Sequence, residues 1–339
     1  MRPVPRFLVA VAIVLLELSL GDMNASAESN RQPNPSAAAE KKIRDKVTEI
    51  SAHRTPEQVR LLIADWKERE PDSPDPYIVS ASYELQLGRQ PMQVYETATG
   101  NQTHPGKDGA TEYPVVDKSG RQAGVIGVVP TGPPPDPATV KKQQLRAAVE
   151  LEEALKKFPN RIDLMIGRAM ALGEAREWDV LAQHMESILQ RAANDPENLR
   201  SYGNEKPSRS PADELLGGLQ GFITSAINEQ DLERARHFAQ LGLKYFSERG
   251  ELLSDMGSIH FMSQQWDEAV PYFEHARQVA PEDNVILLNL TLVYLQLGRA
   301  DDARATAREI VRLHRDIAIT NTALDILHRL DSQSPTGRP

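Results

Sequence analysis

The chain has 339 residues, with 39 Lys and Arg, 48 Asp and Glu, and no cysteine. The formal charge of −9 argues against the basic surface that nucleic-acid binding requires. Without cysteine the chain can form no disulfide, thiolate metal site or catalytic thiol. Aromatic residues make up 5%, which is low for one large core and ordinary for stacked helix pairs that touch through Ala and Leu.

The first 27 residues have the three parts of a secretory signal peptide. Arg2 and Arg6 precede the apolar run Phe7–Leu16, and the small residues Ala25–Ala27 follow it. An uncleaved membrane anchor is the alternative, but the apolar run is well short of the ~20 residues that span a bilayer. We therefore expect a mature chain that begins at Glu28, is periplasmic or secreted, and has no integral membrane span.

Helix pairs are predicted from about residue 38 to residue 92. Thr55 is a typical N-cap, Pro56 suits the first helical position, and Gln58 completes a capping box. The stretch 74–88 then has the pattern of a helix that ends at Gly88.

Residues 93–139 interrupt the helical pattern. Two β-rich runs flank residues 117–120, and Gly120 suits the positive φ of a hairpin loop, so the sequence predicts a β-hairpin at about 113–129. The proline-rich stretch 130–137 should form an extended return to the helices. Helices are then predicted over 140–195, and the composition of 196–215 predicts a loop.

Alanine recurs at a fixed interval in the C-terminal part of the chain. Ala235, Ala269 and Ala303 are equally spaced along the sequence. Small residues at such positions let helices in successive pairs approach closely. Around Ala269 the matching positions are Leu253, Met256, Gly257, His260, Phe273, Ala276 and Pro281. The amphipathic stretch 318–331 should end the array as a capping helix.

This pattern resembles the tetratricopeptide repeat (TPR) family, in a form typical of exported bacterial proteins. The resemblance implies an all-α fold, a superhelical solenoid of helix pairs, here carrying the hairpin-bearing insertion. In the repeat register the alanine expected at position 93 arrives only at Ala147. The delay is too long for a simple turn and indicates an insertion within one helix pair.

The resemblance also implies a concave groove lined by the first helix of each pair. The family's groove positions fall here on Thr224, Ile227, Ser254, Ser258, Phe261, Met262, Leu288, Leu292 and Leu295. The chaperone-binding carboxylate clamp of one TPR subgroup is absent, because Gln220 and Asp255 are among the residues at its positions. Some of the nine groove residues could instead pack against neighbouring helices, and these two interpretations stay open.

No motif for catalysis, a metal or a cofactor stands out. His260 occupies the repeat's usual Tyr position, where a packing role is favoured over a ligand role. We therefore expect a non-enzymatic scaffold that binds a protein or peptide. Its expected location would suit a complex in the cell envelope. We expect it to bind no nucleic acid, no cofactor and no metal. The alternative is an enzyme or enzyme subunit with a site at the 93–139 insertion.

The expected organisation is a signal peptide (1–27), a polar lead-in (28–37), N-terminal helix pairs (38–92), the insertion (93–139), TPR-like helices (140–195), a loop (196–215), three TPR repeats (216–317), a capping helix (318–331) and a disordered tail (332–339).

Overall fold

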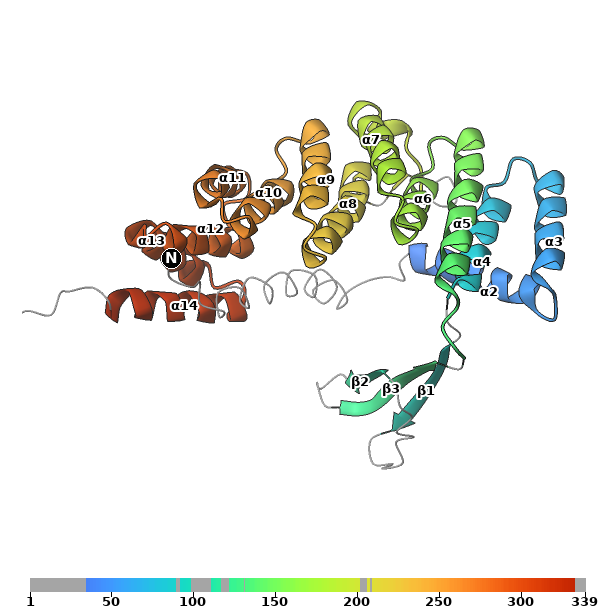
Figure 1. Ribbon diagram of the computed structural model, residues 1–339, viewed down its shortest axis with the longest axis horizontal. Helices are drawn as coiled ribbons and strands as arrows, with labels where there is room; N and C mark the ends of the chain where they lie inside the picture. The colour runs from blue at the N-terminus through green and yellow to red at the C-terminus, as the bar shows by residue number, and fades with distance from the viewer. Residues whose placement is uncertain are drawn as a thin grey trace, which may run out of the picture. The chain divides into compact units, whose positions relative to one another are not determined.

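The computed structural model describes the backbone of residues 35–332, except 90–91, 99–110, 117–121, 131, 202–205 and 208. Side chains are described from residue 41 on, with the further exception of 90–131. The expected signal peptide, most of the lead-in and nearly all of the tail lie outside the described residues. Within the described part the fold is helical apart from three strands in the insertion (Figure 1). The contacts divide the described residues into two compact units, 36–181 and 182–332.

The first unit contains helices α2 (Pro35–Ser51), α3 (Pro56–Arg69), α4 (Asp75–Leu87), α5 (Pro137–Lys157) and α6 (Ile162–Glu174), and α7 (Trp178–Asn194) begins at its end. The predicted capping box that starts α3 is confirmed. The Thr55 hydroxyl accepts a bond from the Gln58 backbone N–H at 3.4 Å, and the Gln58 side-chain oxygen accepts one from the Thr55 N–H at 2.9 Å. A cluster of buried apolar residues, including Val59, Ile63 and Tyr83, joins α2, α3 and α4.

Between α4 and α5 the chain forms the strands β1 (Met92–Ala98), β2 (Thr111–Val116) and β3 (Gln122–Pro130). The sheet has the order β1-β3-β2, and both pairings are antiparallel. The strands β2 and β3 coincide with the hairpin stretch named from sequence, whereas β1 was not predicted. Pro114 lies on β2, an edge strand, where a missing backbone donor costs least.

The second unit continues from α7 through a short 3₁₀ helix (Pro196–Asn198) to α8 (Pro211–Asn228), α9 (Leu232–Tyr245), α10 (Gly250–Met262), α11 (Trp266–Val279), α12 (Asn284–Gln296), α13 (Ala300–Leu313) and α14 (Ile317–Ser332). Consecutive helices lie side by side from α8 to α14 (Figure 1). The helix α8 begins inside the predicted 196–215 loop, because Pro211 at its start is followed by two acidic residues that suit a helix N-terminus.

The turn between the two helices has the same geometry in four helix pairs. Arg176, Gln230, Gln264 and Gly298 follow α6, α8, α10 and α12, and all four have positive φ. The next residue donates its N–H to a carbonyl five positions back, as from Gln265 to His260. This is the Schellman bond that satisfies the last carbonyls of a helix.

Close helix contacts explain the periodic small residues. Ala235, Ala269 and Ala303 are each fully buried, as predicted for residues at helix crossings. Gly257 lies against the ring of Phe273, so that a Cβ added there would be 2.7 Å from two ring carbons. The core of this unit therefore depends on residues that keep the helix backbones close.

Candidate functional site

The nine predicted groove residues lie on α8, α10 and α12, the first helices of three successive pairs. The helix α10 contacts both α8 and α12. The Gln220 amide donates a hydrogen bond to the Asp255 carboxylate at 3.3 Å, and the Asn289 amide donates one to the Ser254 hydroxyl at 3.4 Å. These side-chain bonds link α8 to α10 and α10 to α12. We call the surface along these helices the first-helix face.

Four of the nine predicted groove residues are not available to a partner. Ile227, Ser254, Leu288 and Leu292 are buried, with exposed fractions of 4%, 8%, 0% and 3%. For Leu288 and Leu292 the cause is the C-terminal helix α14, which contacts α12 and packs Ile319 against them. Their burial favours the packing interpretation over the groove interpretation for these four residues.

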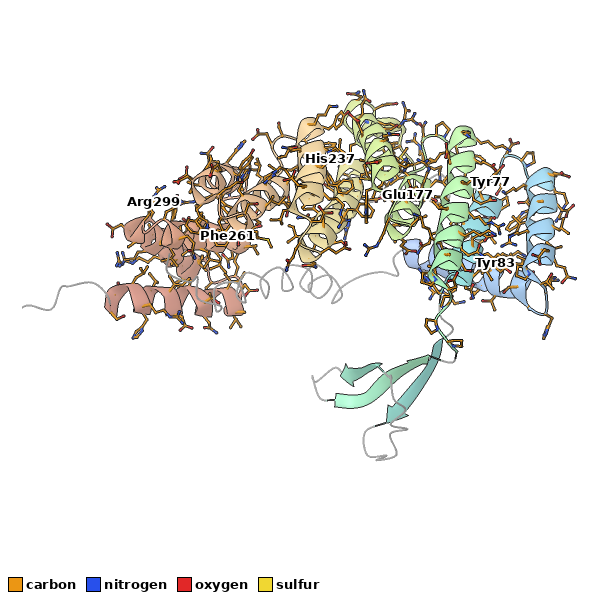
Figure 2. The ribbon with its side chains drawn as sticks, in the orientation of Figure 1. Tyr77, Tyr83, Glu177, His237, Phe261 and Arg299 are labelled. Atoms are coloured by element: carbon orange, nitrogen blue, oxygen red, sulfur yellow. The ribbon has the colours of Figure 1, made fainter. Side chains whose placement is uncertain are left out.

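The other five predicted residues retain some exposure. Met262, at the C-terminal end of α10, is 40% exposed. Thr224 and Ser258 are partly buried. Phe261 (Figure 2) and Leu295 are also partly buried, and both pack against the core clusters around α12, so they contribute more to stability than to an open surface. Met262 is therefore the most exposed of the nine predicted groove residues.

Asp255 adds a titratable group to this face. Asp255, Ser258 and Met262 follow one another at intervals of three and four residues, which places them on one stripe of α10. Burial is the main cause that raises the pKa of the Asp255 carboxyl to about 7, and the Glu251 carboxylate acts in the same direction. The hydrogen bond from Gln220 opposes both. Near neutral pH this carboxyl is therefore divided between its charged and neutral forms.

Sequence reasoning considered Asp255 only as a departure from the carboxylate clamp. The available signal was its position between Gln220 and Asn289, which lie close to one repeat length before and after it. These three polar side chains stand at neighbouring places on consecutive first helices. Amide and carboxyl groups of this kind are chemically able to form hydrogen bonds with a peptide backbone.

The histidine at the repeat's Tyr position packs as expected. The His260 ring stacks on Tyr272 with centroids 5.3 Å apart, and its Nδ1 lies 2.9 Å from the Gln265 side-chain oxygen. Among the described residues, no group of three or more His, Asp or Glu side chains could hold a metal ion. Likewise, none of the described helices has the length and apolar character needed to cross a membrane.

A family model described as tetratricopeptide repeat matches residues 260–322, from the end of α10 into α14. This part of the chain therefore carries the repeat that its spacing indicated. A comparison with curated proteins finds no match.

Several solved structures are similar to this chain. TTC0263, a thermophilic TPR protein of Thermus thermophilus, is 15% identical with a TM-score of 0.33, and the match covers 55% of this chain and 92% of that one. MamA from Desulfovibrio magneticus is 12% identical with a TM-score of 0.31, over 57% and 88% of the two chains. YrrB, described as a TPR protein with an unusual peptide-binding site, is 10% identical with a TM-score of 0.36, over 78% and 97%. These scores are too low to indicate what this chain binds.

Proposed function

We propose that this chain is an exported scaffold that binds a protein or peptide partner on the first-helix face of α8 and α10. The N-terminal pattern of basic, apolar and small residues supports export to the periplasm or beyond. The TPR match over 260–322 supports a role in protein–protein interaction. A partner in the cell envelope would follow from such a location. The enzyme alternative has no supporting observation, because it concerns insertion side chains that lie outside the described part.

The observation that carries the proposal is the exposure of Met262 beside polar groups on one stripe. A flexible apolar side chain adapts to varied partner surfaces, and it gains free energy when it leaves water. Ser258 and the Asp255 carboxyl lie on the same stripe of α10, and Thr224 is a partly buried groove position on α8. Binding surfaces commonly combine an exposed apolar side chain with hydrogen-bonding groups in this way.

The test is affinity capture with the mature chain, residues 28–339, in an extract of the organism that makes it. Met262→Glu should lose proteins that the wild type retains, because a charge replaces the apolar contact. Val279→Glu is the matched control, since Val279 is 37% exposed on the second helix α11. Capture of the same proteins by wild type and Met262→Glu would refute this site. Recovery of material that still begins at Met1 from the periplasm or medium would refute export with cleavage.

A further inference from the structure

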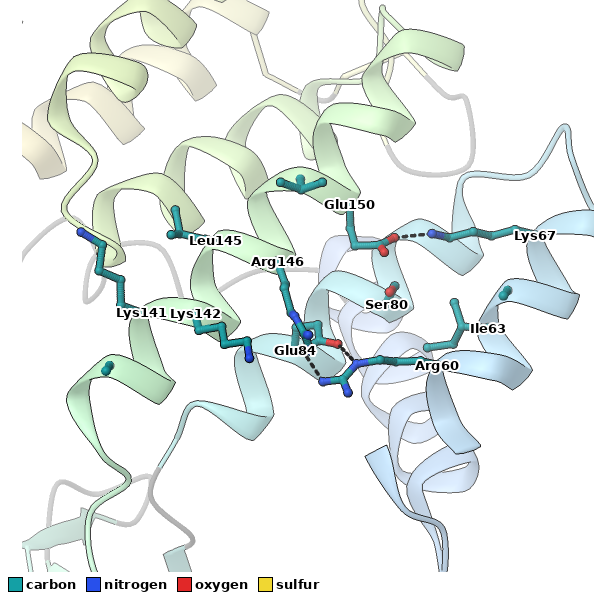
Figure 3. Close-up of a pocket in the computed structure, with 13 residues that line it drawn as sticks. Arg60, Ile63, Lys67, Ser80, Glu84, Lys141, Lys142, Leu145, Arg146 and Glu150 are labelled. Atoms are coloured by element: carbon teal, nitrogen blue, oxygen red, sulfur yellow. Dashed lines mark hydrogen bonds and ion pairs between the residues drawn. The ribbon is translucent and has the colours of Figure 1, made fainter. Parts of the chain in front are cut away.

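A cavity of about 700 Å³ lies in the first unit, between α3, α4 and α5 (Figure 3). It is separate from the first-helix face and from the residues that match the repeat family. Its lining comes from α3 at positions 60, 63, 64 and 67, and from α5 at seven positions between 138 and 150. On both helices these positions follow the pattern i, i+3, i+4 and i+7, so one stripe of each helix faces the cavity.

The cavity is a trough as long as three helical turns. The lining positions of α5 extend from Ala138 to Glu150. At ~1.5 Å per residue this stripe is roughly 18 Å long. A volume of several hundred Å³ is also the size of known ligand sites. An extended trough between two helices has room for a third helix or a strand of a partner.

Apolar side chains line part of the trough. Ile63 and Ala64 contribute from α3, and Leu145 and Val149 contribute from α5. Val149 is 54% exposed, although it lies on a face between two helices. A side chain in this position gains free energy if an apolar surface covers it.

The charged side chains that line the trough are mostly cationic. Five basic and two acidic side chains line it, which gives a net charge of +3 in a chain whose overall charge is −9. Glu84 is buried and already bound, because Arg60 donates to both of its oxygens at 2.6 and 3.1 Å. Arg146 approaches the same carboxylate at 3.9 Å, and Lys67 pairs with Glu150 (Figure 3).

The acidic residues therefore leave an excess of positive charge along α5. Lys141 is half-exposed and pairs with Glu177 at 2.8 Å. Lys142 is exposed, and no described acidic residue pairs with it. Positive charge along one edge of an apolar trough favours a ligand that carries carboxylates beside an apolar stripe.

We propose that the α3–α5 trough binds an amphipathic helix of a partner protein, with leucine-like residues toward Val149 and Asp or Glu toward Lys141, Lys142 and Arg146. A small anion would neutralise the positive charge and leave the apolar side chains of the trough in water. An uncharged apolar helix would cover the apolar side chains but leave Lys142 without an acidic partner among the described residues. The acidic amphipathic helix satisfies both features, and its length over three turns matches the stripe of α5.

The experiment uses three labelled peptides of three to four helical turns and the purified mature chain, with binding followed by fluorescence anisotropy. The first peptide has a leucine stripe flanked by glutamates. The second has lysines in place of the glutamates, and the third has serines in place of the leucines. We expect the glutamate–leucine peptide to bind at least about tenfold more tightly than either of the others. Its affinity should also fall as salt is raised, because exposed charges are screened.

Variants of the protein locate the site. Lys142→Glu should weaken binding of the glutamate–leucine peptide by about tenfold or more, since it removes one attraction and adds a repulsion. Val149→Ser should weaken binding to a degree that changes little with salt. Lys156→Glu is the matched control, because it makes the same charge change at an exposed position of α5 outside the trough. All three positions are exposed, and circular dichroism would confirm that the helices persist.

Several outcomes would overturn the proposal. One is failure of the glutamate–leucine peptide to bind. Others are equal binding of the glutamate and lysine peptides, or equal losses in Lys142→Glu and Lys156→Glu. Displacement of the peptide by inorganic phosphate or by a single-stranded oligonucleotide at similar concentration would indicate a general anion site instead. None of these measurements involves Met262, so this proposal and the proposed first-helix site can fail independently.

Discussion

Replacing Gly257 with alanine tests whether close backbone packing determines the repeat. A Cβ built on Gly257 would lie 2.7 Å from two carbons of the Phe273 ring and 2.8 Å from a third. Favourable carbon–carbon contacts need roughly 3.5–4.0 Å. Phe273 is 1% exposed and packs within the cluster that includes Ala269 and Tyr294, so its ring has little room to move away.

Two opposing effects decide the sign of this substitution. Alanine is favoured over glycine inside a helix by about 1 kcal/mol, because glycine loses more backbone entropy. Overpacking a well-filled core costs about 1–3 kcal/mol. We therefore expect Gly257→Ala to lower the free energy of unfolding, by up to about 2 kcal/mol. Gly217→Ala in α8 is the matched control, because no atom lies within 4 Å of its added Cβ. It should raise the free energy of unfolding by up to about 1 kcal/mol.

Urea unfolding followed by circular dichroism measures both variants. The double variant Gly257→Ala/Phe273→Leu should recover part of the loss, with a coupling energy on the order of 1 kcal/mol, because the smaller side chain makes room for the methyl group. If Gly257→Ala and Gly217→Ala change stability in the same direction and by the same amount, helix propensity alone explains both. The close approach of Gly257 to Phe273 would then not be the reason why position 257 is a glycine.

Two further predictions concern the first-helix face. Leu292→Ala should lower the free energy of unfolding by about 2–5 kcal/mol, because Leu292 is buried among α12, α13 and α14, whereas Met262→Ala should change it by less than about 1 kcal/mol. Equal losses in a denaturation assay would contradict the division of this face into core and surface. The raised pKa of Asp255 should make the wild type lose stability as pH rises above the group's usual value of 3.8 and through about 7, because the folded state binds the proton more tightly than the unfolded state. A pKa shift of one unit corresponds to ~1.4 kcal/mol. Because Asp255 is only partly buried, we discount the full shift and expect Asp255→Asn to raise the free energy of unfolding by about 1–2 kcal/mol near pH 8. Asp325→Asn, at an exposed position of α14, should change nothing, and an unaltered pH profile in Asp255→Asn would refute this cause.

The helical repeat was predictable because its signals are local. The even spacing of alanines follows from contacts that each pair makes with its neighbour, and the capping box at Thr55 lies within a single helical turn. His260 could be assigned to packing for the same reason, since its contact with Tyr272 lies inside one helix pair. Such features depend little on how the rest of the chain is arranged.

The groove was less predictable because its exposure depends on distant segments. Leu288 and Leu292 occupy positions that face open space in an internal repeat, but here α14 covers them. The family pattern gives the position of a residue within one repeat and does not say whether a later helix covers that position. The α3–α5 trough was missed for a similar reason. Arg60 and Lys142 lie on opposite sides of the insertion in the sequence, and no periodic signal connects them.

The insertion and the trough are connected by helix α5, which follows the insertion in the chain, lines the trough and is longer than other second helices. The second helices α9, α11 and α13 each have 14 residues, whereas α5 has 21. The helix α11 begins three residues before Ala269, the small residue of its repeat. If α5 began at the same distance before Ala147, its first residue would be Gln144, whereas it begins at Pro137.

The additional turns of α5 begin at Pro137. Asp136 is the N-cap, and its side chain accepts a hydrogen bond from the Thr139 N–H at 3.0 Å. These turns carry Lys141 and Lys142, the two lysines that line the trough near its start. A direct turn from Gly88 to the normal start of a second helix would leave out both lysines. The insertion therefore adds more than a sheet between α4 and α5, because the helix by which the chain returns supplies much of the positive charge that distinguishes this trough.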